Sequence, residues 1–408
     1  MLYVHRSERA DRLVEILGDV LADPLEDPMA AEVVAVPTRG VERWLAQRLS
    51  HRLGTATGRS DGVCANFAFP FPGTLVSGAT ARASGLDPAA DPWPPERSVW
   101  PLLELVDAHL DESFLGALAA HLRTASPPGP AAPVRRFATV RHLADLYDHY
   151  GVHRPELIRA WASADPGAES WQAELWRRLR QRIGVPSPAE RLQAASDRLV
   201  AEPQLLDLPV RLSLFGLTRL PASQLTVLHA VAQARDVHLF LLHPSGALWD
   251  EVAARQPHPA AGLRRRADPT AALPANPLLR SWGRDAREMQ LVLAARGASP
   301  GQHRPVGEQG ASLLARIQAD IRADRPPSPR LSLDAADASL RIHSCHGRSR
   351  QVEVMRDAIL HLLAGDPTLE PRHIIVMCPD IEHFAPLLHA AFDAEDGPDP
   401  ELPALRVR

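Results

Sequence analysis

The feature that most constrains the fold of this chain is a short β-branched segment followed at once by a tight turn and an amphipathic helix. Val33–Val36 is such a segment, Pro37–Gly40 is the turn, and apolar residues at helical spacing continue through Val41–Leu49. Further along, strand-like runs at Val210–Phe215 and Val237–Leu242 flank another helical stretch. Short apolar β-branched runs are typical of buried parallel strands, which crossover helices connect. The sequence therefore predicts an α/β fold with a parallel sheet.

A long helical segment separates these two units. Apolar residues recur at helical spacing over most of residues 98–201, and Pro-rich breaks divide the segment. We interpret it as an all-helical insertion. The expected helices are Trp100–Leu110, Phe114–Leu122, Val140–Tyr150, Pro155–Ala162 and Ser170–Ile183.

A further α/β unit is expected at the end of the chain. It comprises a strand at Leu340–Ser344, a helix at Ser349–Leu363, a strand at His373–Met377 and a helix at Ile381–Phe392. Between this unit and the preceding strands, polar and Pro/Gly-rich residues bracket a helix expected at Asn276–Ala295. Leu402–Arg408 resembles the start of another strand, so we expect the natural chain to continue.

The turn Pro37–Gly40 occupies the position at which a phosphate-binding loop would lie. A working loop needs several glycines, a lysine for the β- and γ-phosphates and a hydroxyl for Mg²⁺. This turn has one glycine, and the chain has no lysine anywhere, because all 45 of its basic residues are arginine. A planar guanidinium at Arg39 does not replace a compact ammonium. The residues favour a turn at Thr38, Arg39 and Gly40 that binds no nucleotide, and they also exclude Schiff-base chemistry through lysine.

The strand Val210–Phe215 lacks a second part of an ATPase. In such enzymes, a strand ends in the acidic residue that orders Mg²⁺. Here Phe215 is followed by Gly216, Leu217 and Thr218, none of which carries a carboxylate. Two separate ATPase requirements are therefore missing.

Two other chemical sites are possible on composition but weakly supported. His343, Cys345 and His346, together with Cys378, could suggest zinc, but the usual ligand spacings are missing and a polar strand end is favoured. Asp145 and Asp148 lie three residues apart on one helix face, where paired-carboxylate chemistry is conceivable. An ordinary acidic surface helix is the simpler interpretation, and no third metal ligand is apparent nearby.

Net charge and cysteine content limit the binding partners and the compartment expected for this chain. The formal net charge of −4 gives no general attraction to nucleic acid, so any DNA contact must come from a local arginine surface. Three widely spaced cysteines do not form a disulfide framework and fit a reducing cytoplasm. No apolar run approaches the length of a membrane span, and no membrane partner is expected.

Nine short strings distributed in order along the chain resemble the RecC family, the gamma subunits of exodeoxyribonuclease V. They include Val36–Leu45, the aromatic-proline string Phe69–Pro72, and Ala144–Tyr150 followed by Arg154-Pro155. The other strings begin at Met1, Trp171, Phe215, Asn276, Cys345 and Gly365. Each string is weakly specific, but nine in register are strong, and they cover about the N-terminal third of the family's usual length.

This resemblance implies a degenerate superfamily 1 helicase-like fold that has lost its ATPase residues. Residues 1–97 and 202–335 would form the first helicase-like α/β domain. Residues 98–201 would be its helical 1B-like insertion, and 336–408 would begin a second α/β domain.

The resemblance also implies a role. RecC subunits hold RecB and RecD together, split the duplex, and thread the 3′ strand past a site that reads the recombination hotspot Chi. The family's Chi-reading positions fall on Phe71, Ser77, Asp145, Leu146, Asp148 and Arg154. At Ser77, a small polar side chain replaces the family's aromatic, so the usual base stacking is not expected there.

The expected function is thus a non-catalytic DNA-binding scaffold, with double-stranded DNA ends and single-stranded DNA as partners. RecB-like and RecD-like subunits would use the ATP and Mg²⁺, and this chain would need no cofactor or metal of its own. The alternative is an ATP-dependent helicase subunit with its own motor activity.

Overall fold

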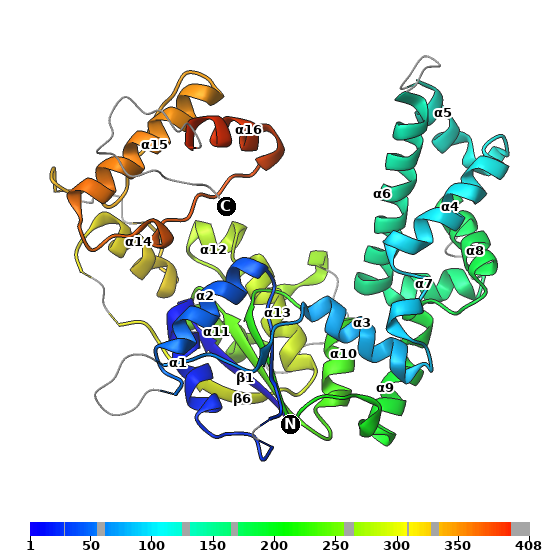
Figure 1. Cartoon of the computed structure of the whole chain (residues 1–408), viewed down its shortest axis with the longest axis horizontal. Helices are drawn as coiled ribbons and strands as arrows, with labels where there is room; N and C mark the ends of the chain where they lie inside the picture. The colour runs from blue at the N-terminus through cyan, green and yellow to red at the C-terminus, as the bar shows by residue number, and fades with distance from the viewer. Residues whose placement is uncertain are drawn as a thin grey trace. The chain divides into compact units, whose positions relative to one another are not determined.

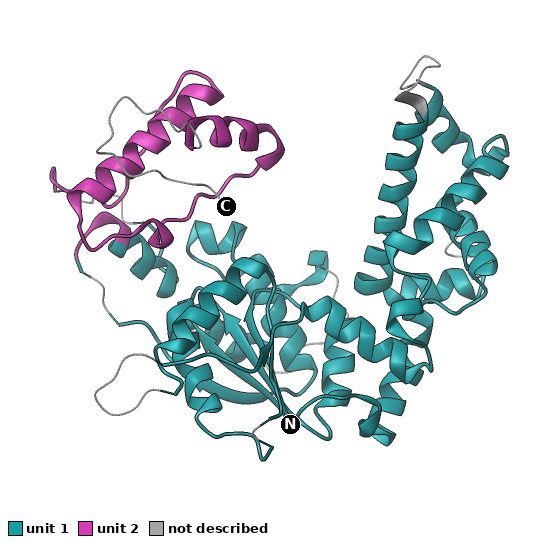
Figure 2. Ribbon diagram, in the orientation of Figure 1, with its two compact units in different colours: residues 1–310, 315–330 teal, residues 311–314, 331–408 magenta. Residues whose placement is uncertain are grey.

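The computed structural model describes residues 1–27, 29–54, 62–124, 131–164, 170–256, 265–307, 310–327 and 334–392. The chain divides into two compact units, shown in Figure 2. Unit 1 comprises residues 1–310 and 315–330, and unit 2 comprises residues 311–314 and 331–408. Each unit has its own apolar core.

Unit 1 is built on a six-stranded sheet with the order β3-β2-β4-β5-β1-β6, and every pairing is parallel. The predicted α/β class with a parallel sheet is therefore confirmed. Because all pairings are parallel, the carboxyl ends of the strands lie at one edge of the sheet and the amino ends at the other. The strands are β1 (Leu2–Ser7), β2 (Glu32–Ala35), β3 (Phe67–Ala68), β4 (Arg211–Leu217), β5 (Asp236–Leu242) and β6 (Ser299–His303).

Helices cover both faces of the central strands, whose alternate residues point to opposite sides. Val34 packs with helices α1 and α2 on one face, while Val33 and Ala35 pack with α3, α9, α10 and α13 on the other. Phe240 is fully buried on the first face, and a side chain of this kind contributes about 1.5–3 kcal/mol through burial. The helices are α1 (Ala10–Leu21), α2 (Arg39–Ser50), α3 (Pro72–Ala83), α9 (Pro188–Ala201), α10 (Ala222–Val231), α11 (Gly246–Arg255), α12 (Pro277–Ser281) and α13 (Arg284–Ala295).

Between β3 and β4 the chain forms a group of helices with a separate core around Leu102, Ile158 and Trp176. The helices expected in this segment are confirmed, with α6 longer than predicted. Local signals set some ends: Ser170 accepts a hydrogen bond from the Ala173 amide, and Gly184 adopts φ 76° after α8. The helices are α4 (Pro95–His109), α5 (Gly116–Thr124), α6 (Ala131–His153), α7 (Pro155–Ala162) and α8 (Trp171–Ile183).

The single helix predicted over Asn276–Ala295 is wrong, because the chain forms two helices, α12 and α13, with a turn at Trp282-Gly283. An added Cβ at Gly283 would lie 2.7 Å from the carbonyl oxygen of Leu279. The backbone therefore folds back on α12 too closely for a continuous helix with an ordinary residue at this position. Strand β6 was also missed, and it forms by pairing with the edge of β1.

Unit 2 contains α15 (Arg348–Gly365) and α16 (Ile381–Phe392), which pack through Val352, Leu360 and Leu388. The remaining helix, α14 (Leu313–Arg322), begins in unit 2 and ends in unit 1. α15 and α16 agree with the helices expected at Ser349–Leu363 and Ile381–Phe392.

The strands predicted at Leu340–Ser344 and His373–Met377 are wrong. Both segments lack strand pairing, and Ile342, Ile375 and Met377 are each more than 80% exposed. An apolar β-branched run becomes a strand only when a neighbouring strand pairs with it, and the described part of unit 2 provides none. The expected second α/β unit is therefore helical within the described residues. The strand expected at Leu402–Arg408 lies outside them.

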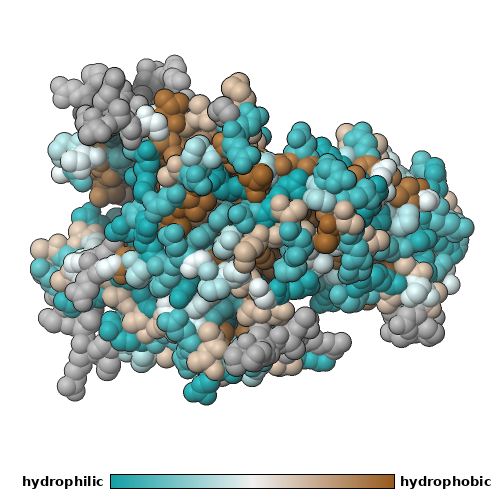
Figure 3. Space-filling view, turned by 90° about the horizontal axis from the view of Figure 1, so that it is seen from below, coloured by the Kyte–Doolittle hydropathy of each residue, from teal (hydrophilic) through white to brown (hydrophobic). Residues whose placement is uncertain are grey.

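No helix among the described residues is long and apolar enough to cross a membrane. On the face shown in Figure 3, hydrophobic residues occur in separate small groups among hydrophilic ones.

Candidate DNA-contacting surface

The carboxyl edge of the sheet brings together two predicted positions that are distant in sequence. β2 and β3 pair in parallel, and the Val36 amide then donates to the Pro70 carbonyl at 3.0 Å. The segments that follow β2 and β3 therefore begin side by side at the carboxyl edge of the sheet. As a result, the Arg39 guanidinium lies over the Phe71 ring, 5.5 Å from its centroid.

The residues of the predicted degenerate loop are engaged by their own helix. The Thr38 hydroxyl accepts a hydrogen bond from the Val41 amide at 3.2 Å and caps α2. Arg39 forms a 2.7 Å ion pair with Glu42 and keeps 70% of its side chain exposed. Gly40 has negative φ and open space around it, apart from the Thr38 hydroxyl oxygen 3.7 Å from an added Cβ. The turn therefore starts a helix and presents an arginine beside an aromatic ring.

Ser77 lies on α3, which begins immediately after Phe71. Its hydroxyl donates to the Thr74 carbonyl within the same helix, and the side chain is exposed. Ser77 thus shares a helix with the aromatic position but offers no stacking face.

Asp145, Leu146 and Asp148 lie on α6. Asp145 pairs with Arg141 at 3.3 Å, and Leu146 packs partly against the helical core. Asp148 reaches the surface, yet the surrounding protein partly desolvates its carboxyl group and raises its pKa, and the charges of Glu96 and Asp145 act in the same direction. The two aspartates are acceptors on one helix surface.

Arg154 lies where α6 ends and α7 begins. Its carbonyl accepts the Leu157 amide at 2.9 Å, and its amide donates to the Tyr150 carbonyl at 2.8 Å, so its backbone is fixed by both helices. This end of α6 contacts the sheet layer, because the Ser223 hydroxyl at the start of α10 donates to the Val152 carbonyl at 2.6 Å. Arg154 is therefore held near the carboxyl edge of β4.

Sequence reasoning missed Arg219, which follows β4 at this edge. Burial, followed by repulsion from Arg219, lowers the pKa of His153 at the end of α6. On its other side, Arg219 lies 3.7 Å from the carboxylate of Asp285 at the start of α13. The available signal was a basic residue in the turn that follows the predicted strand Val210–Phe215. Arg39, Phe71, Arg154 and Arg219 define what we call the carboxyl-edge surface.

Comparison with known proteins identifies the family. Residues 2–324 match the sequence model described as RecC, N-terminal domain. The RecBCD enzyme subunit RecC of Mycobacterium tuberculosis (strain CDC 1551 / Oshkosh) is 43% identical over 415 residues, covering 100% of this chain and 37% of the relative. The chain belongs to the RecC family.

More distant RecC proteins align over most of the same residues. The RecBCD enzyme subunit RecC of Escherichia coli (strain K12) is 28% identical over 406 residues, covering 88% of this chain and 35% of the relative. The corresponding protein of Haemophilus influenzae is 26% identical over 428 residues, with 88% and 36% covered. This RecC-family chain thus spans little more than a third of the length of the curated relatives it matches.

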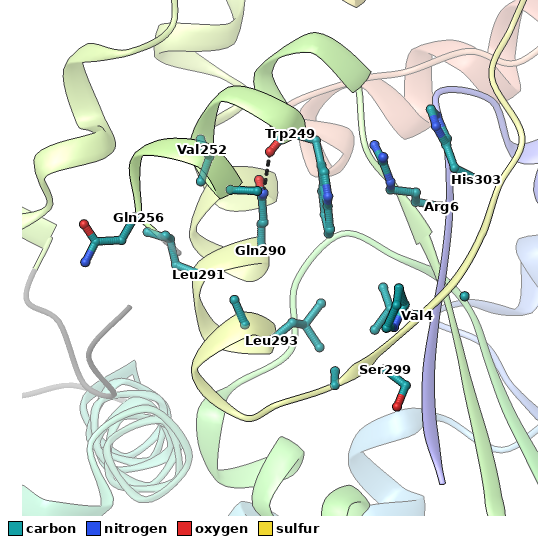
Figure 4. Close-up of a pocket in the computed structure, with 15 residues that line it drawn as sticks. Val4, Arg6, Trp249, Val252, Gln256, Gln290, Leu291, Leu293, Ser299 and His303 are labelled. Carbon is teal, nitrogen blue, oxygen red and sulfur yellow. Dashed lines mark hydrogen bonds between the residues drawn. The ribbon is translucent and has the colours of Figure 1, made fainter. Parts of the chain in front are cut away.

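Outside the carboxyl-edge surface, the described part of this RecC-family chain offers a cavity but no candidate metal-binding group. Within the described ranges, no group of three or more His, Cys, Asp or Glu side chains is placed to hold a metal ion. A cavity of about 300 Å³ lies between β1, β6, α11 and α13. Figure 4 shows Arg6 beside the Trp249 ring there, 4.9 Å from its centroid. The lining is mostly apolar and includes none of the predicted site residues.

Proposed function

We propose that this chain is a non-catalytic, DNA-binding scaffold and recognition part of a RecBCD-type helicase–exonuclease. It would act in duplex splitting and Chi recognition during repair of double-strand breaks by homologous recombination. Its curated relatives are named RecBCD enzyme subunit RecC, which supports this setting. The relation between Arg39 and Phe71 at the carboxyl edge carries the proposal for this chain's own residues.

The arrangement at that edge suits DNA better than ATP. A nucleotide-binding ATPase would need a lysine and a metal-ordering carboxylate there. The chain instead offers a guanidinium beside an aromatic ring, and β4 is followed by Thr218 and Arg219. Arginine attracts phosphate, and an aromatic face stacks on unpaired bases of any sequence.

The carboxyl-edge surface also explains how a chain of negative net charge could bind DNA. A protein of formal charge −4 has no general attraction for DNA, so contact depends on local groups. Arg39 supplies such a group beside Phe71, and Arg154 and Arg219 supply others at the same edge of the sheet. The aspartates on α6 would add acceptors for the amino groups of bases, which is the chemistry of reading a sequence in single-stranded DNA.

The finer fold assignment follows the same proposal. We infer a superfamily 1 helicase-like arrangement, with residues 1–97 and 202–335 as a 1A-like domain and 98–201 as a 1B-like insertion. Residues 336–408 would begin a 2A-like domain. The parallel sheet and the helices that emerge between β3 and β4 support the first two assignments.

The partners would be RecB-like and RecD-like subunits, which would supply the ATP, the Mg²⁺ and the nuclease chemistry. A cytoplasmic location fits work on chromosomal DNA and the three free cysteines Cys64, Cys345 and Cys378.

ATP hydrolysis tests the proposal. This chain should hydrolyse ATP no faster than background, with or without single-stranded DNA. Hydrolysis above background that is abolished by Arg39→Ala would contradict the scaffold assignment and favour a helicase subunit with its own motor. Arg159→Ala serves as the matched control, because this exposed arginine pairs with Glu156 on α7, outside the turn, and its loss should leave any rate unchanged.

A further inference from the structure

Trp282 is the most exposed of the large aromatic side chains that the structure describes, with 83% of its surface accessible. Tryptophan is rarely left in water, because a free ring of this size forgoes a large burial energy. Trp100, also exposed, contacts the tilted ring of Phe137, with ring centroids 5.5 Å apart. Among the described residues, Trp282 has no aromatic neighbour of this kind.

The backbone holds Trp282 in a fixed turn. The Trp282 amide donates to the Leu278 carbonyl at 2.8 Å, and the Gly283 amide donates to the Leu279 carbonyl at 3.0 Å. The chain then approaches α12 so closely that only glycine fits at position 283. The preceding residues are anchored as well, because the Asn276 side chain donates to the Arg325 carbonyl at 2.9 Å. The ring is therefore presented on a rigid support.

Arginines surround this turn. Arg280 and Arg284 stand two residues before and after Trp282, both exposed. Arg284 has no carboxylate within ion-pair distance in the described part of the chain. Arg265 pairs with Glu288 at 2.6 Å and lies 3.4 Å from Asp285. The immediate surroundings of the ring are therefore positively charged overall.

Arg219 of the carboxyl-edge surface lies close to the helix that follows the Trp282 turn. Arg219 approaches Asp285, three residues after Trp282, on one side and acts on His153 at the end of α6 on the other. Arg154 is the next residue after His153. Arg219 thus lies between the end of α6, next to Arg154, and the start of α13, which follows the Trp282 turn, and α12 lies at the carboxyl edge of the sheet in Figure 1.

We propose that the Trp282 turn is a stacking platform for a base of single-stranded DNA, with Arg280 and Arg284 contacting the adjacent phosphates. An unpaired base can lie flat on an indole ring, whereas a base inside a duplex cannot reach it. A flexible phosphate backbone would pair with Arg284 and with the remaining N–H groups of Arg280, whose guanidinium also donates to the Pro274 carbonyl at 2.9 Å. The inference rests on the proposed function, to which it adds a second contact region outside the predicted Chi positions.

The test uses the full protein assembled with its RecB-like and RecD-like subunits. Binding of an oligothymidine strand would be measured at several salt concentrations without ATP. Trp282→Ala should weaken binding by roughly tenfold, and Trp282→Phe should restore most of the affinity. Arg284→Ala should make the slope of log affinity against log salt concentration shallower by about one, as expected for the loss of one phosphate contact. Trp100→Ala is the matched control and should leave binding unchanged.

The outcomes separate the platform from the proposed function. Unchanged affinity after Trp282→Ala in a complex that binds the strand would overturn the platform alone. Loss of the partner subunits from the Trp282→Ala protein would also overturn it, because Trp282 would then anchor a protein interface. Failure of the unsubstituted complex to bind the strand would overturn the proposed function as well. Unfolding temperatures within about 2 °C for all variants would exclude misfolding, because exposed substitutions cost little stability.

Discussion

The Arg39 guanidinium lies over the Phe71 ring at 5.5 Å, because the parallel pairing of β2 and β3 and the hydrogen bond from the Val36 amide to the Pro70 carbonyl bring the two segments together. This pair joins the predicted degenerate loop to a predicted hotspot-reading position. Arg39 also pairs with Glu42, which orients the guanidinium from the α2 side. The two residues are therefore expected to act on the same DNA segment.

Phe71→Ala should weaken binding of single-stranded DNA by the assembled complex by about 1–3 kcal/mol, the usual value of one base–aromatic stack. Fluorescence anisotropy with a labelled oligonucleotide measures this change. Phe137→Ala is a suitable control, because Phe137 has nearly the same exposure, 37% against 39%, but lies on α6 away from the sheet edge. Equal losses for both variants would argue against a specific role for Phe71.

Arg154→Ala should alter the response to the hotspot while leaving the unwinding rate intact, because the side chain lies at the surface while its backbone fixes the α6–α7 junction. Asp145→Ala should act in the same direction. The measurement compares cleavage products of hotspot-containing and hotspot-free DNA. Arg159→Ala, on the exposed side of α7, is the control. An unaltered hotspot response in the Arg154 variant would remove that residue from the proposed site.

Acid should destabilise unit 1 through two buried histidines, His5 and His243, and the half-buried His238. Burial is the largest cause that lowers the pKa of His5, His238 and His243 from 6.5 to about 4, and His5 is also repelled by His238. The folded-state pKa lies below the unfolded value, so folding favours the neutral rings. Their contribution is therefore complete above pH 6.5 and is lost as the pH falls toward about 4.

Urea unfolding at pH 7 and pH 5 checks this prediction. The His5 and His238 rings share a hydrogen bond of 3.0 Å, and His238 also stacks on Tyr3. His238→Phe keeps an aromatic ring in that stack but removes one titrating group. The variant should lose less stability than the unsubstituted chain between the two pH values. An identical pH dependence in both proteins would contradict the assignment.

The buried ion pair between Arg287 and Asp268 should matter far more than an exposed one. The two groups are 2.7 Å apart, and each side chain is at most 3% exposed. Arg287→Leu would leave a buried carboxylate without its partner, at a cost of about 3–5 kcal/mol in the free energy of unfolding. Arg159→Leu, which breaks the exposed pair with Glu156, should cost less than about 1 kcal/mol. Similar costs for both variants would show that burial does not decide the effect.

Sequence patterns predicted the elements that are buried and local. Val33–Val36 was recognisable because both faces of that strand are covered, so its residues are uniformly apolar. β6 was not recognisable, because Ser299–His303 is polar and becomes a strand only through pairing with β1. The opposite error occurred at His373–Met377, whose apolar residues suggest a strand although no partner pairs with them. Pairing between distant segments is absent from a local pattern.

For the candidate site too, sequence predicted individual residues but not the contacts between distant segments. Sequence resemblance supplied Phe71 and Arg154, and the missing lysine and carboxylate indicated that the turn at Thr38 is degenerate. The contact between Arg39 and Phe71 depends on strand pairing, and the position of Arg219 between α6 and α13 depends on how the helices pack. Neither relation is visible before the chain is folded.

Photo-crosslinking in the assembled complex tests the central claim most directly. A single-stranded oligonucleotide carrying photoreactive thymine analogues and a photoreactive ATP analogue would be offered together, and crosslinked peptides of this chain would be identified. The proposed scaffold role predicts DNA crosslinks in peptides containing Phe71, Arg154 or Trp282, and nucleotide crosslinks only on the partner subunits. A nucleotide crosslink at Thr38–Gly40, with no DNA crosslink on this chain, would contradict it.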